Sequence, residues 1–311
     1  MNGELIVLTL TFLGVGSAFA KRNYQSNALV EAWSESPERQ DAPDDNLLID
    51  FGSTGPLALY QLKDLAGFSY LVRNGAIYYP AIRRVFITHV HQDHIGGIEE
   101  FAILNRRSRL YQDSSVEKPL LLGAPGVLDL LWENCLKGGL GVMANRRVAL
   151  DDYFRVVRLG GASAGNDGKF TLLDRYELSI FPTDHVRLNE KYDWPSYGLV
   201  IHDLQSGESV VYSGDTRFDP ESLIPKAEHA RLIFHDVQLE PEPDSVHALL
   251  GELRTWPEPI RRKMVLYHFS DGWEDPKYRV VKAEFAGFAF PQRRVVLFGS
   301  SPHPSGPNRV V

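Results

Sequence analysis

Cysteine is nearly absent from this sequence, because Cys135 is the only one among 311 residues. A single thiol cannot form an internal disulfide, and it supplies no cysteine-type zinc site. Any bound metal would therefore need histidine and carboxylate ligands. The same scarcity favours a reducing, cytoplasmic location.

An excess of positive charge is also missing. Lysine and arginine number 33 against 40 aspartates and glutamates, which gives a net charge of −7. General coating of nucleic acid rests on excess positive charge, so that class of protein is excluded. Arginine clusters at residues 83–84, 106–109 and 146–147 could still contact single phosphates, although an ordinary solvated face is the simpler interpretation of each.

Long apolar runs are scarce as well. Residues 5–19 are the most apolar stretch, and they fall short of the roughly 20 residues of a membrane span, so no membrane segment is predicted. The small residues that end this run imitate a secretory cleavage site. However, Glu4 precedes the run without any lysine or arginine, and glycines and threonines interrupt it. We therefore interpret Leu5–Leu13 as a first core strand.

The sequence does contain enough apolar material for a large core, since 43% of its residues are hydrophobic and 23% are charged. This composition is typical of a soluble globular protein. We predict a single domain over residues 1–299 and a loose, proline-containing tail over residues 300–311. Residues 105–175 are less regular, which favours a lid or an insertion.

Apolar strands that end in polar groups are the main pattern along the chain. Each of five predicted strands is followed by a histidine or an aspartate. These strands are residues 84–88, 176–181, 209–213, 231–234 and 263–267. Strand ends on one edge of a sandwich would bring those polar groups to a single site. Helices are predicted over residues 95–104 and, from an amphipathic pattern, over residues 245–256.

The densest polar cluster is Thr88–Gly97, with the sequence Thr-His-Val-His-Gln-Asp-His-Ile-Gly-Gly. Alternate residues of an extended backbone point the same way, so His89 and His91 can converge on one ion. Asp93 and His94 would turn toward a second point nearby. Imidazole and carboxylate suit zinc and neighbouring divalent metals, so this stretch predicts a metal site.

Residues after the later strands can complete a set of ligands for two ions, with three ligands for each ion and one bridging carboxylate. The first ion would be bound by His89, His91 and His185, the second by Asp93, His94 and His268, with Asp215 as the bridge. Two such ions can activate water and neutralise charge on attacking and leaving oxygens. Zinc is the expected metal, with manganese or iron as alternatives.

The Thr-His-x-His-x-Asp-His-x-Gly-Gly stretch resembles the signature of the metallo-β-lactamase fold superfamily. The resemblance implies an α/β fold, a four-layer αββα sandwich with a dinuclear metal site on one edge. His185, Asp215 and His268 fall where the later ligand motifs of that superfamily are expected.

A closer resemblance is to ribonuclease Z, the transfer-RNA 3′ endonuclease. It is carried by residues 11–18, 22–23, 48–50, 213–217 and 266–270. That family has a His-Glu-Ala-Thr motif and a later histidine, whose carboxylate–histidine pair passes a proton to the leaving oxygen. The matching positions here are Asp236, with Asp in place of Glu, and His247. The resemblance thus implies that Asp236 and His247, together with Asp93, are catalytic, and that the chain is a homodimer.

The predicted function is hydrolysis of a phosphodiester, either in RNA at the transfer-RNA 3′ end or in a small cyclic nucleotide. No counterpart of the long ribonuclease Z arm that clamps transfer RNA is found. Two alternatives stay open: a metallo-hydrolase of a carboxylic ester, lactone or thioester, and a non-catalytic metal-binding relative. Arg217 and Ser270 are candidate substrate contacts, and Tyr192, Trp194 and Tyr197 could stack on a base.

Overall fold

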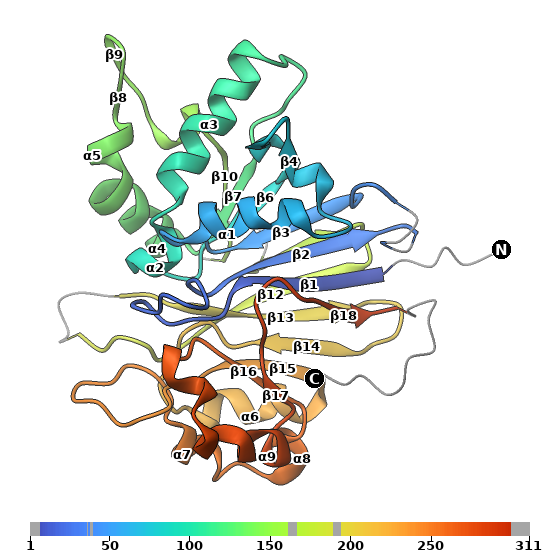
Figure 1. Ribbon diagram of the computed structural model, residues 1–311. Helices are drawn as coiled ribbons and strands as arrows, with labels where there is room; N and C mark the ends of the chain where they lie inside the picture. Colours follow the sequence, from blue (N-terminus) through green and yellow to red (C-terminus); the bar gives the residue numbers. More distant parts are fainter. Residues whose placement is uncertain (1–6, 36, 38–39, 161–166, 189–193, 300–311) are drawn as a thin grey trace.

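The computed structural model describes residues 7–35, 37, 40–160, 167–188 and 194–299. Over these residues the chain forms two large mixed sheets packed face to face, with helices on both outer sides (Figure 1). This is the predicted four-layer αββα sandwich of the metallo-β-lactamase fold. The predicted tail, residues 300–311, and Tyr192 lie outside the described residues.

The first sheet has seven strands in the described part of the chain. In spatial order they are β10 (Arg155–Arg158), β7 (Leu120–Gly123), β6 (Arg84–Phe86), β3 (Asp45–Ile49), β2 (Asn27–Trp33), β1 (Val7–Gly14) and β18 (Arg294–Phe298). The apolar run near the N-terminus is therefore a core strand, because all eight residues of β1 are buried.

The second sheet also has seven strands among the described residues. Their order is β11 (Lys169–Leu172), β12 (Tyr176–Pro182), β13 (Tyr197–Asp203), β14 (Ser209–Tyr212), β15 (Ala230–Asp236), β16 (Met264–Tyr267) and β17 (Gly287–Phe288). Thus all five strands that were predicted to end in polar groups are present, one in the first sheet and four in the second.

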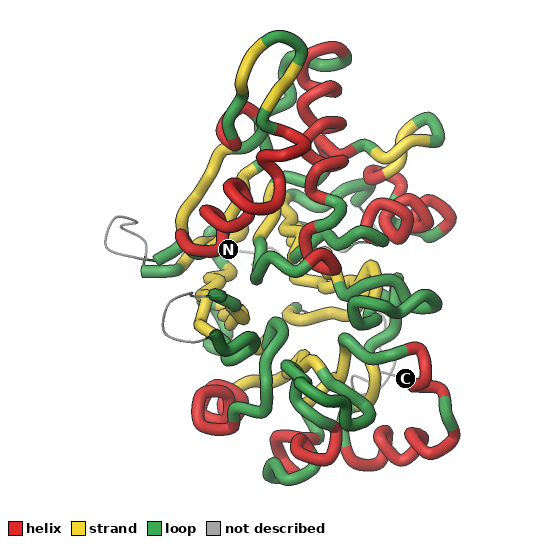
Figure 2. Tube along the Cα trace, turned by 90° about the vertical axis from the view of Figure 1, so that its left-hand side faces the viewer, coloured by secondary structure: helices red, strands yellow, loops and turns green. Residues whose placement is uncertain are grey.

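Helices cover the outer face of each sheet, and Figure 2 shows them as separate groups above and below the strands. Over the first sheet lie α1 (Gly55–Gln61), α2 (Gln92–Ile95), α3 (Ile98–Tyr111), α4 (Pro125–Leu130), a π-helix (Leu131–Leu136) and α5 (Lys137–Leu140). Over the second lie α6 (Pro220–His229), α7 (Leu250–Leu253), α8 (Glu258–Arg261) and α9 (Val281–Glu284). No helix within the described residues has the length and apolar character needed to cross a membrane.

Alternation along the strands divides the core in two. In β3, Leu47 and Ile49 face the second sheet, whereas Leu48 packs in the cluster that contains the helices over the first sheet. Successive side chains of a strand point to opposite faces, so a strand covered on both faces is apolar throughout.

Residues 105–175 contribute to both sheets rather than standing apart from them. They supply β7 and β10 to the first sheet and β11 to the second. Between them, the short hairpin of β8 (Val142–Met143) and β9 (Arg146–Arg147) projects near α5 (Figure 1). A second short hairpin, β4 (Val72–Arg73) with β5 (Ala76–Ile77), precedes the metal-binding segment.

Two predicted helices are wrong in detail. The predicted helix over residues 95–104 is broken at Gly96 and Gly97, between α2 and α3. At this break the Gly97 N–H donates to the carbonyl of Phe51 at 2.8 Å, and a Cβ on Gly96 would lie 2.0 Å from the Ser53 hydroxyl. Only glycine allows two backbone segments to approach this closely.

The predicted helix over residues 245–256 forms only at α7. Its first half is extended instead, because the Gln238 N–H donates to the Ala248 carbonyl and the Ala248 N–H donates to the Thr216 carbonyl, at 2.9 and 3.0 Å. Tertiary hydrogen bonds therefore override the local helical pattern. The result places His247 beside the ends of β14 and β15.

Parallel strands explain why the polar groups meet. In the first sheet β3, β6, β7 and β10 are parallel neighbours, and in the second β14, β15, β16 and β17 are. Ligand sites in such sheets lie beyond the carboxyl ends of the strands. A backbone hydrogen bond of 3.1 Å from Tyr197 to Thr88 joins the two sheets at this edge.

Candidate metal centre

Three imidazoles form the first cluster at the carboxyl edge of the sheets. Nδ1 of His91 lies 3.0 Å from Nε2 of His89 and 3.1 Å from Nε2 of His185. His89 and His185 are buried, while His91 is half-buried. His89 and His91 follow β6 and His185 follows β12, so this cluster spans both sheets.

Asp93, His94 and His268 form the second cluster. Oδ2 of Asp93 lies 3.3 Å from Nε2 of His94 and 3.2 Å from Nε2 of His268. All three residues are buried. His268 follows β16 with a positive φ of 62°, and this left-handed residue directs the chain back toward the site.

Asp215 faces both clusters. Its Oδ2 lies 3.1 Å from Nε2 of His94 and 3.3 Å from Nε2 of His268. The same oxygen lies 3.8 Å from Nε2 of His89 and 3.9 Å from Nε2 of His185. The structure thus brings together all seven side chains predicted as ligands, with this carboxylate between the two groups.

A divalent metal fits this arrangement. Oδ1 of Asp215 is buried and has no hydrogen-bond partner within the described part of the chain, and the carboxylate oxygens near the buried Nε2 of His94 lie outside hydrogen-bond geometry. Unpaired buried polar atoms cost about 1–3 kcal/mol each, and a metal ion would satisfy both. These residues and their clustered neighbours therefore have the chemistry of a metal site.

The protonation states of the first cluster and of Asp215 point the same way, whereas at His94 and His268 burial would lower the pKa but the Asp215 carboxylate raises it. Burial lowers the pKa of His185 to about 4 and holds the pKa of His89 well below its ordinary value. Burial alone would raise the pKa of Asp215, but the imidazoles of His268 and His94 hold it well below its ordinary value. Neutral imidazole and ionised carboxylate are the forms that ligate metals.

Asp50 orients the metal-binding loop from outside the cluster. Its Oδ2 accepts a hydrogen bond from the Thr88 hydroxyl at 2.7 Å and lies 2.8 Å from Nδ1 of His94. A donor at Nδ1 leaves Nε2 for a metal, as is usual for ligating histidines. Asp50 was not among the site residues predicted from the sequence. Its position directly after a buried strand, like that of His268, was the available signal.

Asp236 and His247 form a pair beside the clusters. Nδ1 of His247 lies 2.9 Å from Oδ2 of Asp236 and 3.9 Å from Oδ2 of Asp215. Burial would raise the pKa of Asp236, but hydrogen bonds from His235 and His247 lower it. The 2.9 Å contact shows that Asp236, although shorter than the expected glutamate, reaches His247.

The two predicted substrate contacts differ in their surroundings. Arg217 donates from Nε to the carbonyl of His185 at 3.0 Å and from Nη1 to that of Ser245 at 2.6 Å. It thus braces the backbone of a ligand and of the segment that carries His247, and contact with a substrate stays a prediction. Ser270 is exposed, two residues beyond His268.

One of the three predicted aromatic stackers lies against the site. The ring of Trp194 is 5.6 Å from that of His91, at an interplanar angle of 37°. Trp194 and Tyr197 are both half-buried. An indole at this position offers a flat surface next to the most accessible ligand.

Solved structures share this fold. The metallo-β-lactamase fold protein YhfI of Bacillus subtilis aligns with a TM-score of 0.64 at 16% identity, over 93% of this chain and 99% of that one. The short form of human tRNase Z aligns with a TM-score of 0.57 at 18% identity, again over 93% and 99%. At these identities the likeness concerns the fold alone.

Sequence similarity is stronger to a named family. The Anti-Pycsar protein Apyc1 of Paenibacillus harenae is 35% identical over 263 residues, which covers 84% of this chain and 90% of that protein. The family model described as Anti-Pycsar protein Apyc1 matches residues 8–295. The chain therefore belongs to the Anti-Pycsar protein Apyc1 family.

Proposed function

We propose that this chain is a phosphodiesterase that uses two divalent metal ions, most readily zinc, to hydrolyse a small cyclic nucleotide. The observation that carries the proposal is the contact between His247 and Asp236 at 2.9 Å, next to the carboxylate that faces both clusters. When bound, the ions would activate water and neutralise charge on the phosphate oxygens.

The residues of the pair have a defined task in this reaction. Nδ1 of His247 is engaged by Asp236, so the proton that the imidazole can transfer is carried on Nε2. The Thr216 N–H donates to Oδ2 of Asp236 at 3.3 Å and holds the carboxylate in place, while Nδ1 of His235 contacts the Asp236 backbone carbonyl at 2.7 Å. This positioned imidazole can deliver a proton to the departing oxygen, and such general acid catalysis contributes about 10²–10⁴-fold.

Three observations favour a small substrate over transfer RNA. The net charge of −7 opposes long contacts with a polyanion. In the described part of residues 105–175, the projecting β8–β9 hairpin has only two residues in each strand, which is short for an arm that clamps transfer RNA. Trp194, against His91, supplies a surface on which a single base can stack.

Incubation of the metal-loaded protein with four substrates tests the proposal. These are 3′,5′-cyclic purine and pyrimidine nucleotides, a transfer-RNA precursor with a 3′ trailer, and a lactone. We expect hydrolysis of at least one cyclic nucleotide and loss of that activity after chelation of the metal. Cleavage of only the precursor would show that transfer RNA, and not a cyclic nucleotide, is the substrate. Cleavage of only the lactone would refute phosphodiester chemistry.

A further inference from the structure

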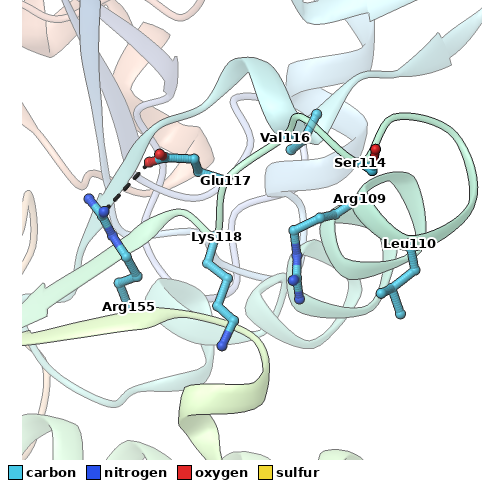
Figure 3. Close-up of a pocket in the computed structure, with 7 residues that line it drawn as sticks. All are labelled: Arg109, Leu110, Ser114, Val116, Glu117, Lys118 and Arg155. Carbon is cyan, nitrogen blue, oxygen red and sulfur yellow. Dashed lines mark ion pairs between the residues drawn. The ribbon is translucent and has the colours of Figure 1, made fainter.

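A basic pocket lies at the edge of the first sheet opposite the metal centre. It is formed by the last turn of α3, the segment that leads into β7 and the first residue of β10, and it has a volume of about 470 Å³ (Figure 3). Its lining includes Arg109, Leu110, Val116, Glu117, Lys118 and Arg155. Arg84, Leu120 and Arg155 are paired across β6, β7 and β10, so the pocket faces the amino ends of these strands. The metal ligands follow the carboxyl end of β6.

Two cations of this pocket are held by backbone rather than by carboxylates. Lys118 donates from Nζ to the carbonyl of Asp151, and Arg109 donates from Nη2 to the carbonyl of Asp152 at 3.4 Å. The Asp152 carboxylate is itself engaged by Arg146 at 3.0 Å. The charges of Arg109 and Lys118 are therefore oriented by the protein, and neither forms an ion pair with a carboxylate of the described residues.

The third cation has a weak partner. Arg155 lies 3.5 Å from Glu117, and the two side chains are 57% and 80% exposed. Exposed pairs of this kind hold each other weakly, so Arg155 can exchange Glu117 for another anion. Three cations and one carboxylate give the lining a charge of about +2 at neutral pH.

Arg109 can also offer a fork. The terminal Nη1 and Nη2 groups of a guanidinium can bind two oxygens of one phosphate. The Nε of Arg109 is buried and faces the protein, so it is not one of these donors. Leu110 and Val116 supply apolar wall beside the cations, and the volume falls in the range of small-molecule sites.

We propose that this pocket binds a small phosphate monoester of nucleotide size. A phosphate monoester carries a charge of about −1.5 to −2 at neutral pH, which complements the lining. Arg109 receives the phosphate with its fork, Lys118 and Arg155 add charge, and the apolar wall contacts the organic part. The site is separate from the metal centre and does not depend on the proposed reaction.

Calorimetric titration of the metal-loaded protein with adenosine monophosphate tests this site. The double variant Arg109→Ala/Lys118→Ala is compared with Arg262→Ala/Lys169→Ala, which removes two exposed basic residues paired with Glu258 and Glu177 elsewhere. We expect the pocket variant to bind at least about tenfold more weakly, or to lose one binding equivalent, with metal content unchanged. The control variant should match the parent protein.

Further ligands and one conservative variant sharpen the result. Adenosine should fail to bind the pocket, inorganic phosphate should bind more weakly, and Arg109→Lys should give an intermediate loss because it keeps the charge without the fork. Equal binding by the parent protein and the pocket variant, or equal losses in both double variants, overturns the proposal. Pocket-dependent binding of a single-stranded oligonucleotide without binding of the monophosphate also overturns it. Thermal melting shows whether each variant is folded.

Discussion

The two ends of strand β6 lie in very different surroundings. Beyond its carboxyl end, His89 and His94 are buried, and Nε2 of His94 has no hydrogen-bond partner within the described residues. At the amino end, Arg155 of the same sheet is more than half exposed and pairs loosely with Glu117. Enclosed and unpaired groups demand a tightly held ion. Solvated charges attract a ligand weakly, in a manner that salt screens.

The largest effect should come from the carboxylate that faces both clusters. Asp215→Ala removes the only ligand predicted to bridge two ions, so metal content should fall and phosphodiester hydrolysis should drop at least about 1000-fold. Metal analysis and initial rates measure both. The matched control is Asp129→Ala, which removes an exposed carboxylate paired with Arg158. Full metal content in Asp215→Ala would show that the carboxylate does not bridge ions.

The next effect should come from the proton-transfer pair. Asp236→Asn and His247→Ala should each lower phosphodiester hydrolysis about 10²–10⁴-fold while the metal stays bound. Rates measured together with metal content separate this outcome from loss of a ligand. If His247→Ala lost metal instead, the histidine would belong to the metal site, as its 3.9 Å distance from Asp215 allows.

A smaller effect is expected at Asp50, which contacts the predicted ligand His94 from outside the cluster. Asp50→Asn weakens the orientation of His94 and Thr88, and such changes lower metal affinity about 10–100-fold. Competition with a chromophoric chelator measures the affinity. An unchanged affinity would mean that the fold alone fixes the orientation of His94.

The smallest effect is expected at the opposite edge. Glu117→Gln removes one exposed charge, so the melting temperature should stay within about 2 °C of the parent value. Binding of a phosphate monoester should nevertheless strengthen, because the single carboxylate of the lining is neutralised. Weaker binding would mean that Glu117 orients Arg155 rather than competing with the ligand.

Sequence patterns predicted the strands well because their signal is local. Strands such as β14 and β16 are short apolar runs, with Asp215 shortly after β14 and His268 directly after β16, and a sandwich brings the ends of such strands together. The proximity of Asp215 and His268 could therefore be predicted from the strands that they follow. The role of Asp50 could not, because one aspartate after a strand carries no sign of the two groups that it will contact.

The errors arose where distant backbone decides the conformation. Residues 245–249 have a helical pattern, yet backbone hydrogen bonds to Thr216 and Gln238 hold them in an extended conformation. The break at Gly96 is required by Phe51 and Ser53, which are more than forty residues earlier in the chain. Local propensity and residue spacing do not reveal such long-range backbone contacts.

The origin of the ligands also bears on how the protein holds together. His89, His91, Asp93 and His94 extend from the first sheet, whereas His185, Asp215 and His268 extend from the second. An ion bound among them would link the two sheets of the sandwich. A ligand that binds only the folded state stabilises that state by mass action. The supply of metal would then set how much of the protein is folded, as well as how much is loaded.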